Sequence, residues 1–250
     1  MASSPTALVT GGSRGIGAAT GITLANRGYD VALTYRNKAA RAEEVAGSIA
    51  RIGVRSLAIR CDITVEEDLE ALFATLRHWT SHLDLLVLNA SGGLERDILA
   101  SDPAYPMRLN RDGQVRLLEH SIPLMMPGST VVFVTSHWAH LYGRIEQLPS
   151  YAPVAETKWA GEQALRARVP ALAVCGIRLI VVTGDLVEGT ITPRLLERGA
   201  PGLARQRRES IGRLPTADEM GEAIAAAATD PSLPTGQTVV VGGTLESLLR

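Results

Sequence analysis

The 250-residue sequence has no long apolar stretch and only two cysteines, Cys61 and Cys175. No apolar run approaches the roughly 20 residues that a membrane-spanning helix needs, so we expect no membrane partner. The cysteines fall in apolar segments that resemble strands, which predicts buried free thiols in a reducing compartment. Residues Met1–Pro5 lack the charged and apolar regions of a secretory signal. We therefore expect a cytoplasmic protein.

The sequence also lacks an excess of charge of either sign. Lysine and arginine number 25 and aspartate and glutamate 26, for a net charge of −1. These residues are interspersed, without the basic stripe that indicates a nucleic-acid partner. The length suits one α/β domain with a sizeable core, and no linker divides the chain, so residues 1–250 are predicted to form a single domain.

Apolar runs alternate with helical patterns along the chain. Several runs are apolar throughout, as in Leu85–Leu88 and Leu179–Val182, which is typical of parallel strands covered on both faces. The predicted strands are Ala7–Thr10, Asp30–Tyr35, Val54–Cys61, Leu85–Asn89, Val131–Thr135, Arg178–Thr183 and Thr238–Val241. The predicted helices are Ile16–Arg27, Ala39–Arg51, Val65–Trp79, Met107–Met126, Val154–Arg168 and Ala217–Ala228. Successive βαβ units predict a Rossmann-type, doubly wound parallel sheet. Residues 91–106 and 185–215 are predicted to be irregular.

A glycine-rich turn joins the first strand to the first helix, with the spacing T-G-x-x-x-G-x-G over residues 10–17. Free backbone N–H groups and the helix dipole at such a turn form an anion site, and glycines let the backbone approach a pyrophosphate closely. The turn therefore predicts a dinucleotide site. Residues of this turn assigned to cofactor binding are Gly11, Ser13, Arg14, Gly15, Ile16 and Gly17.

Further landmarks give the chain a resemblance to the classical short-chain dehydrogenase/reductase family along nearly its whole length. The landmarks are the glycine turn, Asp62-Ile63, Asn89-Ala90-Ser91, Asn110, Ser136, and Thr235-Gly236-Gln237 before Gly242-Gly243. The resemblance implies the strand order 3-2-1-4-5-6-7. It also implies that Asp62, Ile63, Asn89, Ala90 and Ser91 bind a nicotinamide cofactor, and that Ser136 and Asn110 belong to a catalytic tetrad.

The end of the second strand bears on the choice of cofactor. A carboxylate there binds the 2′-hydroxyl of NAD, whereas a cation suits the 2′-phosphate of NADP. The sequence has Arg36 and Lys38 at this point, with Arg14 in the glycine turn. Arginine can bind phosphate through a two-pronged contact. The sequence therefore favours NADP(H), with Arg36 as a cofactor-binding residue.

The catalytic helix departs from the family pattern. The family has Tyr-x-x-x-Lys, but here Val154 stands four residues before Lys158 and Tyr151 stands seven before it. Seven helical residues span about 10.5 Å, against about 6 Å for four. Lowering a tyrosine pKa from about 10 to 7 requires roughly 4 kcal/mol, which a more distant cation supplies less well. Pro153 favours a helix start, so Tyr151 could lie in a loop and fold back beside Ser136.

Two roles for Tyr151 stay open: a displaced catalytic tyrosine or an ordinary packing residue. Tyr142, His137, His140 or a substrate hydroxyl could also donate the proton. The pair His137 and His140 lacks a third ligand nearby, so no metal is expected. The resemblance gives Lys158 a cofactor-binding and catalytic role in every case.

A second departure follows the sixth strand. The family usually has Pro-Gly there, and Gly184, Val187 and Thr190 are the residues assigned to the cofactor by resemblance. Asp185 and Glu188 read better as solvated loop carboxylates than as substrate contacts. Residues 185–215 are long enough to form a substrate lid. Arginines in this lid could attract an acidic substrate.

Two classes of function fit these features. The first is an NADPH-dependent carbonyl reductase that transfers hydride between the cofactor and a ketone, aldehyde or secondary alcohol. The second is a nucleotide-binding regulatory or scaffold protein that kept the fold and lost catalysis. The resemblance also implies a homodimer or homotetramer, assembled through helices near 107–126 and 154–168.

Overall fold

The computed structural model describes residues 4–94 and 96–249, so Met1–Ser3 of the segment searched for a secretory signal lie outside it. One seven-stranded sheet has the order β3-β2-β1-β4-β5-β6-β7, and its neighbouring strands are parallel. The predicted Rossmann-type topology is confirmed. The strands are β1 Thr6–Val9, β2 Asp30–Tyr35, β3 Ser56–Arg60, β4 Leu83–Leu88, β5 Met125–Ser136, β6 Arg178–Gly184 and β7 Thr238–Val241.

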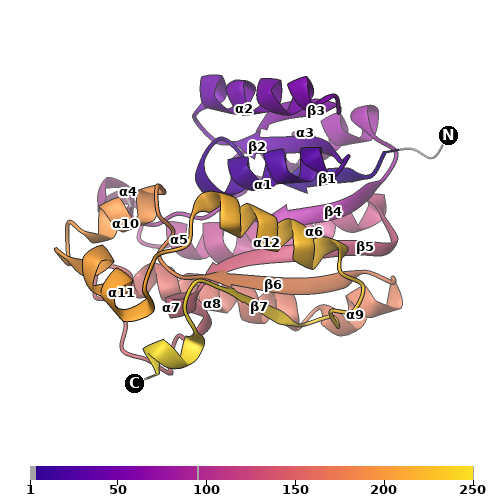
Figure 1. Cartoon of the computed structure of the whole chain (residues 1–250). Coiled ribbons are helices and arrows are strands. Elements are labelled where there is room, and N and C mark those ends of the chain that lie inside the picture. Colours follow the sequence, from indigo (N-terminus) through magenta and orange to yellow (C-terminus); the bar gives the residue numbers. More distant parts are fainter. Residues whose placement is uncertain (1–3, 95, 250) are drawn as a thin grey trace.

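Helices cover both faces of the sheet (Figure 1). The longer ones are α1 Gly15–Asn26, α2 Ala39–Ile52, α3 Glu66–Trp79, α6 Gly113–Ser121, α8 Ala152–Arg166, α11 Leu203–Ile211 and α12 Ala217–Thr229. The shorter ones are α4 Arg96–Ser101, α5 Tyr105–Met107, η1 Arg108–Asp112, η2 Ile122–Leu124, α7 His137–His140, α9 Val169–Val174, α10 Ile191–Leu196 and η3 Leu245–Leu248.

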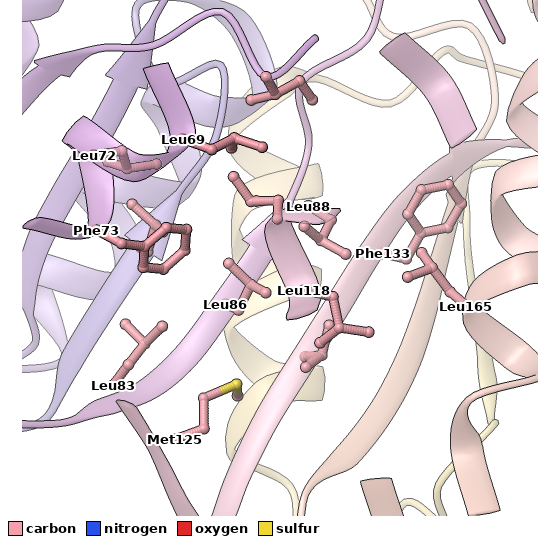
Figure 2. Packing of buried hydrophobic residues seen from close by; sticks show 14 of the residues in the cluster. Leu69, Leu72, Phe73, Leu83, Leu86, Leu88, Leu118, Met125, Phe133 and Leu165 are labelled. Atoms are coloured by element: carbon pink, nitrogen blue, oxygen red, sulfur yellow. The ribbon is translucent and has the colours of Figure 1, made fainter. Parts of the chain in front are cut away.

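Successive side chains of each central strand enter opposite cores. In β5, Val131 and Phe133 face the core formed with α3, α6 and α8, whereas Val132 and Val134 face the core formed with α1 and α12. Figure 2 shows part of the first core, where Phe73 and Phe133 lie among leucines. A strand covered on both faces has no position for a solvated side chain, which is why its sequence is apolar throughout.

The helix predicted over 107–126 is wrong as a single element. The segment consists of α5, the π-helical η1, α6 and the 3₁₀ turn η2, and β5 already begins at Met125. Pro123 lies in η2 and has no N–H to continue an α-helical ladder. The π-helical turn contains Asn110, and π turns inside helices are frequent at functional sites.

Two segments that the sequence analysis read as irregular contain helices. Residues 91–106 include α4 and the start of α5, and residues 185–215 include α10 and α11. Gly202 and Gly212 flank α11 with φ values of 84° each, a conformation that glycine adopts without strain. Helix α4 lies with α10 and α11 at one end of the sheet (Figure 1).

The prediction for the cysteines is half wrong. Cys61 follows β3 directly and is buried, but Cys175 is exposed at the end of α9, three residues before β6 begins. Both thiols are free. Within the described residues, no helix is long and apolar enough to cross a membrane.

Candidate active site

The glycine turn between β1 and α1 is fixed by contacts to the end of β4. The Thr10 hydroxyl accepts the backbone N–H groups of Asn89 (2.9 Å) and Ala90 (3.0 Å). The Asn89 amide donates to the Thr10 carbonyl at 2.9 Å. Gly11 has a φ of 67°, and a Cβ on Gly17 would lie 2.4 Å from the Gly11 carbonyl oxygen. The turn therefore requires glycine at both positions.

A cavity of about 500 Å³ opens at the carboxyl ends of the strands. It lies where the strand order reverses between β1 and β4, which is the usual ligand site of such sheets. The predicted cofactor residues that line it are Gly11, Ser13, Arg14, Gly15, Ile16, Arg36, Asp62, Ile63, Asn89, Ala90, Ser91, Lys158, Gly184, Val187 and Thr190. Ser136 and Tyr151 line it too, whereas Gly17 and Asn110 lie behind its wall.

The hydroxyls of Ser136 and Tyr151 form a hydrogen-bonded pair in this cavity. Ser136 is the last residue of β5, and its Oγ lies 2.8 Å from the Tyr151 Oη. Tyr151 immediately precedes α8, and Pro153 lies in the first turn of that helix. The helix thus begins where the proline predicts, and the tyrosine folds back onto the serine. Burial raises the pKa of Tyr151 to about 12, and the Ser136 hydrogen bond opposes this effect.

Lys158 lies two turns further along α8 and borders the same cavity. Burial lowers the pKa of Lys158 to about 8, while the Glu162 carboxylate, one turn further on, raises it. Glu162 is buried, and its carboxylate accepts hydrogen bonds from His140 Nδ1 (2.9 Å) and Arg166 Nε (2.8 Å). Burial and the Glu162 carboxylate thus act on the pKa of Lys158 in opposite directions.

Asn110 is buried and does not reach the cavity with its side chain. Its amide donates to the Gly92 carbonyl and to the Thr157 hydroxyl, each at 3.0 Å. A Cβ on Gly161 would lie 2.1 Å from the Asn110 carbonyl oxygen, so η1 and α8 touch through backbone at this point. The observed contacts tie the loop after β4 to the catalytic helix.

The end of β2 presents cations and no carboxylate. Arg36, Asn37 and Lys38 follow the strand and border the cavity, together with Arg14 of the glycine turn. The Arg36 guanidinium donates to the Tyr105 hydroxyl and lies 5.4 Å from the centre of that ring. The close backbone at Gly11 and Gly17 and these cations fit the phosphate groups of a dinucleotide.

Asp185 contradicts the interpretation as a solvated carboxylate. Its side chain is fully buried and binds the Arg207 guanidinium of α11 through contacts of 2.7–3.1 Å. Arg207 also donates to Ser247 Oγ at 2.8 Å and lies 5.7 Å from the centre of the Trp138 ring. Glu188 is exposed as predicted and pairs with Arg208 at 2.5 Å. The ion pair with Arg207 is what allows the Asp185 carboxylate to be buried.

The side chains of the other candidate proton donors contact groups outside the cavity lining. His137 is buried, with Nδ1 3.0 Å from Thr183 Oγ1 and Nε2 2.7 Å from the Gly242 carbonyl oxygen, and burial lowers its pKa. Tyr142 packs against Trp159, with ring centres 5.9 Å apart. Of the four side chains named from the sequence as proton donors (His137, His140, Tyr142 and Tyr151), Tyr151 is the one that the described lining of the cavity contains. No group of three or more metal-ligating side chains occurs in residues 4–94 and 96–249.

The sequence analysis did not predict a structural role at the site for three residues, Tyr105, Glu162 and Arg207. Tyr105 and Arg207 could not be found, because their partners Arg36 and Asp185 are 69 and 22 residues away. Glu162 had a readable signal. It stands four residues after Lys158, a spacing that brings helical side chains together.

Comparison with known proteins agrees with this geometry. Residues 11–245 match the model of a family described as enoyl-(acyl carrier protein) reductase. The 1-cyclohexenylcarbonyl-CoA reductase of Streptomyces collinus is 30% identical over 244 residues, which cover 95% of this chain and 85% of that protein. A hydroxynaphthalene reductase-like protein of Metarhizium majus is 28% identical over 256 residues, covering 95% and 93%.

Solved structures show the same fold. The promiscuous reductase LugOII, which catalyses keto-reduction at C1 during lugdunomycin biosynthesis, superposes with a TM-score of 0.82 at 28% identity, covering 96% of this chain and 98% of that chain. A mutant short-chain dehydrogenase/reductase of Serratia marcescens also gives 0.82, at 27% identity, covering 96% and 97%.

Fold and site together define an oxidoreductase that uses a nicotinamide dinucleotide. The chain belongs to the short-chain dehydrogenase/reductase family. Six residues separate its Tyr151 from its Lys158.

Proposed function

We propose that the protein is an NADPH-dependent carbonyl reductase. The observation that carries the proposal is the hydroxyl pair of Ser136 and Tyr151, 2.8 Å apart, in the same cavity as Lys158 and the glycine turn. Two hydroxyls at this separation can both approach one carbonyl oxygen. Such an arrangement stabilises negative charge that develops on oxygen and provides a proton to it.

Each residue has a defined part in the reaction. A bound nicotinamide supplies the hydride. Ser136 donates a hydrogen bond to the carbonyl oxygen, and Tyr151 transfers its phenolic proton to that oxygen as the carbonyl carbon gains the hydride. The resulting phenolate regains a proton from solvent. Lys158, which borders the same cavity, binds the cofactor ribose and favours this phenolate electrostatically. The raised pKa of Tyr151 keeps its proton available before the reaction.

The preference for the phosphorylated cofactor rests on Arg14, Arg36 and Lys38. These cations border the cavity, and no carboxylate follows β2 to bind a free ribose hydroxyl. Arg36 would exchange its contact with Tyr105 for the 2′-phosphate, because a guanidinium binds a phosphate dianion through two parallel hydrogen bonds but a neutral phenol through one. Asp62 and Ile63 would contact the adenine, and Val187 and Thr190 the carboxamide side.

A second candidate reaction is the reduction of a carbon–carbon double bond conjugated to a carbonyl. The names of the matching family and of the Streptomyces collinus relative both describe reductases of unsaturated thioesters. The displacement of the tyrosine by one helical turn from its usual place also favours this candidate. A carbonyl bound at that hydroxyl could present a conjugated carbon, two bonds away, to the hydride donor.

One experiment separates these functions. The purified protein is incubated with NADPH or NADH and cyclohex-2-enone, and the products are identified by mass spectrometry and NMR. Carbonyl reduction gives cyclohex-2-enol, and conjugate reduction gives cyclohexanone. NADPH binding without turnover of this or any other ketone, aldehyde or enone would favour the alternative of a catalytically impaired binding protein. If the protein binds neither NADPH nor NADH, all three functions are refuted.

Two further features belong to the proposal. Helices α10 and α11, within residues 185–215, act as a substrate lid, since Ile191, Leu195 and Leu196 border the cavity. The homodimer or homotetramer typical of the family is expected to form through α6 and α8.

A further inference from the structure

The part of the cavity around the two hydroxyls has an apolar wall. Its side chains come from four separate segments: the loop after β4, α7, α8, and the loop and lid after β6. They form a third hydrophobic cluster, separate from the two cores that flank the sheet. Besides Tyr151 itself, the members of the cluster that line the cavity are Leu94, Trp138, Val154, Leu186 and Leu196.

Among the described residues, no arginine of the lid lines the cavity, although the Arg207 guanidinium lies 5.7 Å from the centre of the Trp138 ring. Arg207 is buried against Asp185, and Arg213 pairs with Glu219 at 2.5 Å. Among the described lining residues, the cations are Arg14, Arg36, Lys38 and Lys158. The first three border the glycine turn and the end of β2, where the adenosine half of a dinucleotide binds. The fourth, Lys158, binds the cofactor ribose in the proposed mechanism. An anionic substrate would therefore lose its hydration without gaining a cation that is free to pair with it, which is costly.

Val154 occupies the helix position four residues before Lys158, where the family has its tyrosine. Its side chain is 3% exposed and borders the cavity. A valine is much smaller than a tyrosine, so the side chain at position 154 fills less of the cavity than a tyrosine there would. Trp138 lies in the same cluster and offers an aromatic surface to whatever fills the remaining space.

We propose that the substrate is an uncharged compound whose carbonyl group is attached to a ring, and that Val154 sets the size of the ring that fits. The reaction assumed here rests on the proposed function. The class of ligand is argued separately, from the apolar wall and from the lack of an available cation beside it. It excludes the acidic substrates that the arginine-rich lid sequence suggested. It applies equally to a ring-substituted ketone and to an uncharged ring-substituted unsaturated ketone.

The first test compares two ligands of the same ring and nearly the same shape. Binding of 2-acetylnaphthalene and of 2-naphthoate to the NADP⁺-loaded protein is measured by calorimetry. We expect the neutral ketone to bind at least about tenfold more tightly. Equal or tighter binding of 2-naphthoate would overturn the proposal. Tight binding of the ketone without any turnover with NADPH would refute the proposed function and leave the ligand class standing.

The second test changes the wall. Val154→Phe should lower kcat/KM for 2-acetylnaphthalene at least about tenfold while changing kcat/KM for butanone less than threefold. Val154→Ala, which removes bulk from the wall, should not lower kcat/KM for 2-acetylnaphthalene relative to that for butanone. Val174→Phe is the matched control, since Val174 is 89% exposed at the end of α9. An equal loss for both ketones in a folded Val154→Phe variant would show that Val154 does not select ring size.

Discussion

Replacing Arg207 with methionine is expected to destabilise the protein strongly, because the change strands a buried carboxylate. The Asp185 side chain is fully buried and that of Arg207 is 6% exposed, so solvent screens the pair little. Removing one partner of such a pair costs about 3–5 kcal/mol. For a domain of this size that corresponds to a fall in melting temperature of roughly 6–20 °C.

The loss should also depend on pH through His137. Its Nε2 lies 4.0 Å from the Asp185 carboxylate. Burial lowers the pKa of His137; Arg207 and His140 add to this, whereas Asp185 and the Gly242 carbonyl oppose it. With Arg207 in place, the unfolded state binds more protons at this histidine than the folded state does below about pH 6.5. The free energy of unfolding therefore decreases as the pH falls through this range. Without Arg207, a protonated His137 can pair with Asp185, and the stability gap should narrow toward pH 5.

Urea denaturation at several pH values measures both effects. Arg205→Met is the matched control, because Arg205 lies on the same helix, is 83% exposed and pairs only at 3.5 Å with exposed Glu209. The double variant Asp185→Asn/Arg207→Met should recover part of the lost stability, since it removes the stranded charge. Equal losses in Arg207→Met and Arg205→Met, or a gap that stays constant with pH, would refute the reasoning.

Three further predictions concern the reaction. Arg36→Ala should raise KM for NADPH by about 10–100-fold and leave KM for NADH unchanged, as measured by steady-state kinetics; equal effects would remove Arg36 from the phosphate site. Tyr151→Phe should lower kcat about 10²–10⁴-fold without weakening NADPH binding in a fluorescence titration, and an unchanged kcat would show that another group is the acid. Glu162→Gln should lower the pKa of Lys158 below about 8 and shift the alkaline limb of the kcat/KM profile to lower pH. Glu156→Gln, on the exposed face of α8, should leave that limb in place.

The sheet was predictable because its strands are buried on both faces. Runs such as Leu179–Val182 have no polar position, and their alternation with helices restricts the topology to a few choices. The glycine turn was predictable for a related reason, since only glycine permits its backbone conformation. Such features depend on neighbours in the sequence.

Features that depend on distant partners were not predictable. Helix α11 is anchored by the pair of Arg207 with Asp185, so neither its order nor the burial of the acid could be inferred from local pattern. The π-helical turn at Asn110 depends on contacts with α8. The placement of Tyr151 is an intermediate case: Pro153 predicted where the helix begins, but only the fold brings the hydroxyl to Ser136.

Residues that follow β7 contact α7 and α11 beside the cavity. The Gly242 carbonyl binds His137, and Ser247 binds the lid arginine Arg207. The first strand, in contrast, starts at the far end of the sheet (Figure 1). Removing the segment from Gly242 to Ser247 should therefore loosen the lid over the reaction site, whereas changes before β1 lie at the opposite end of the sheet from that site.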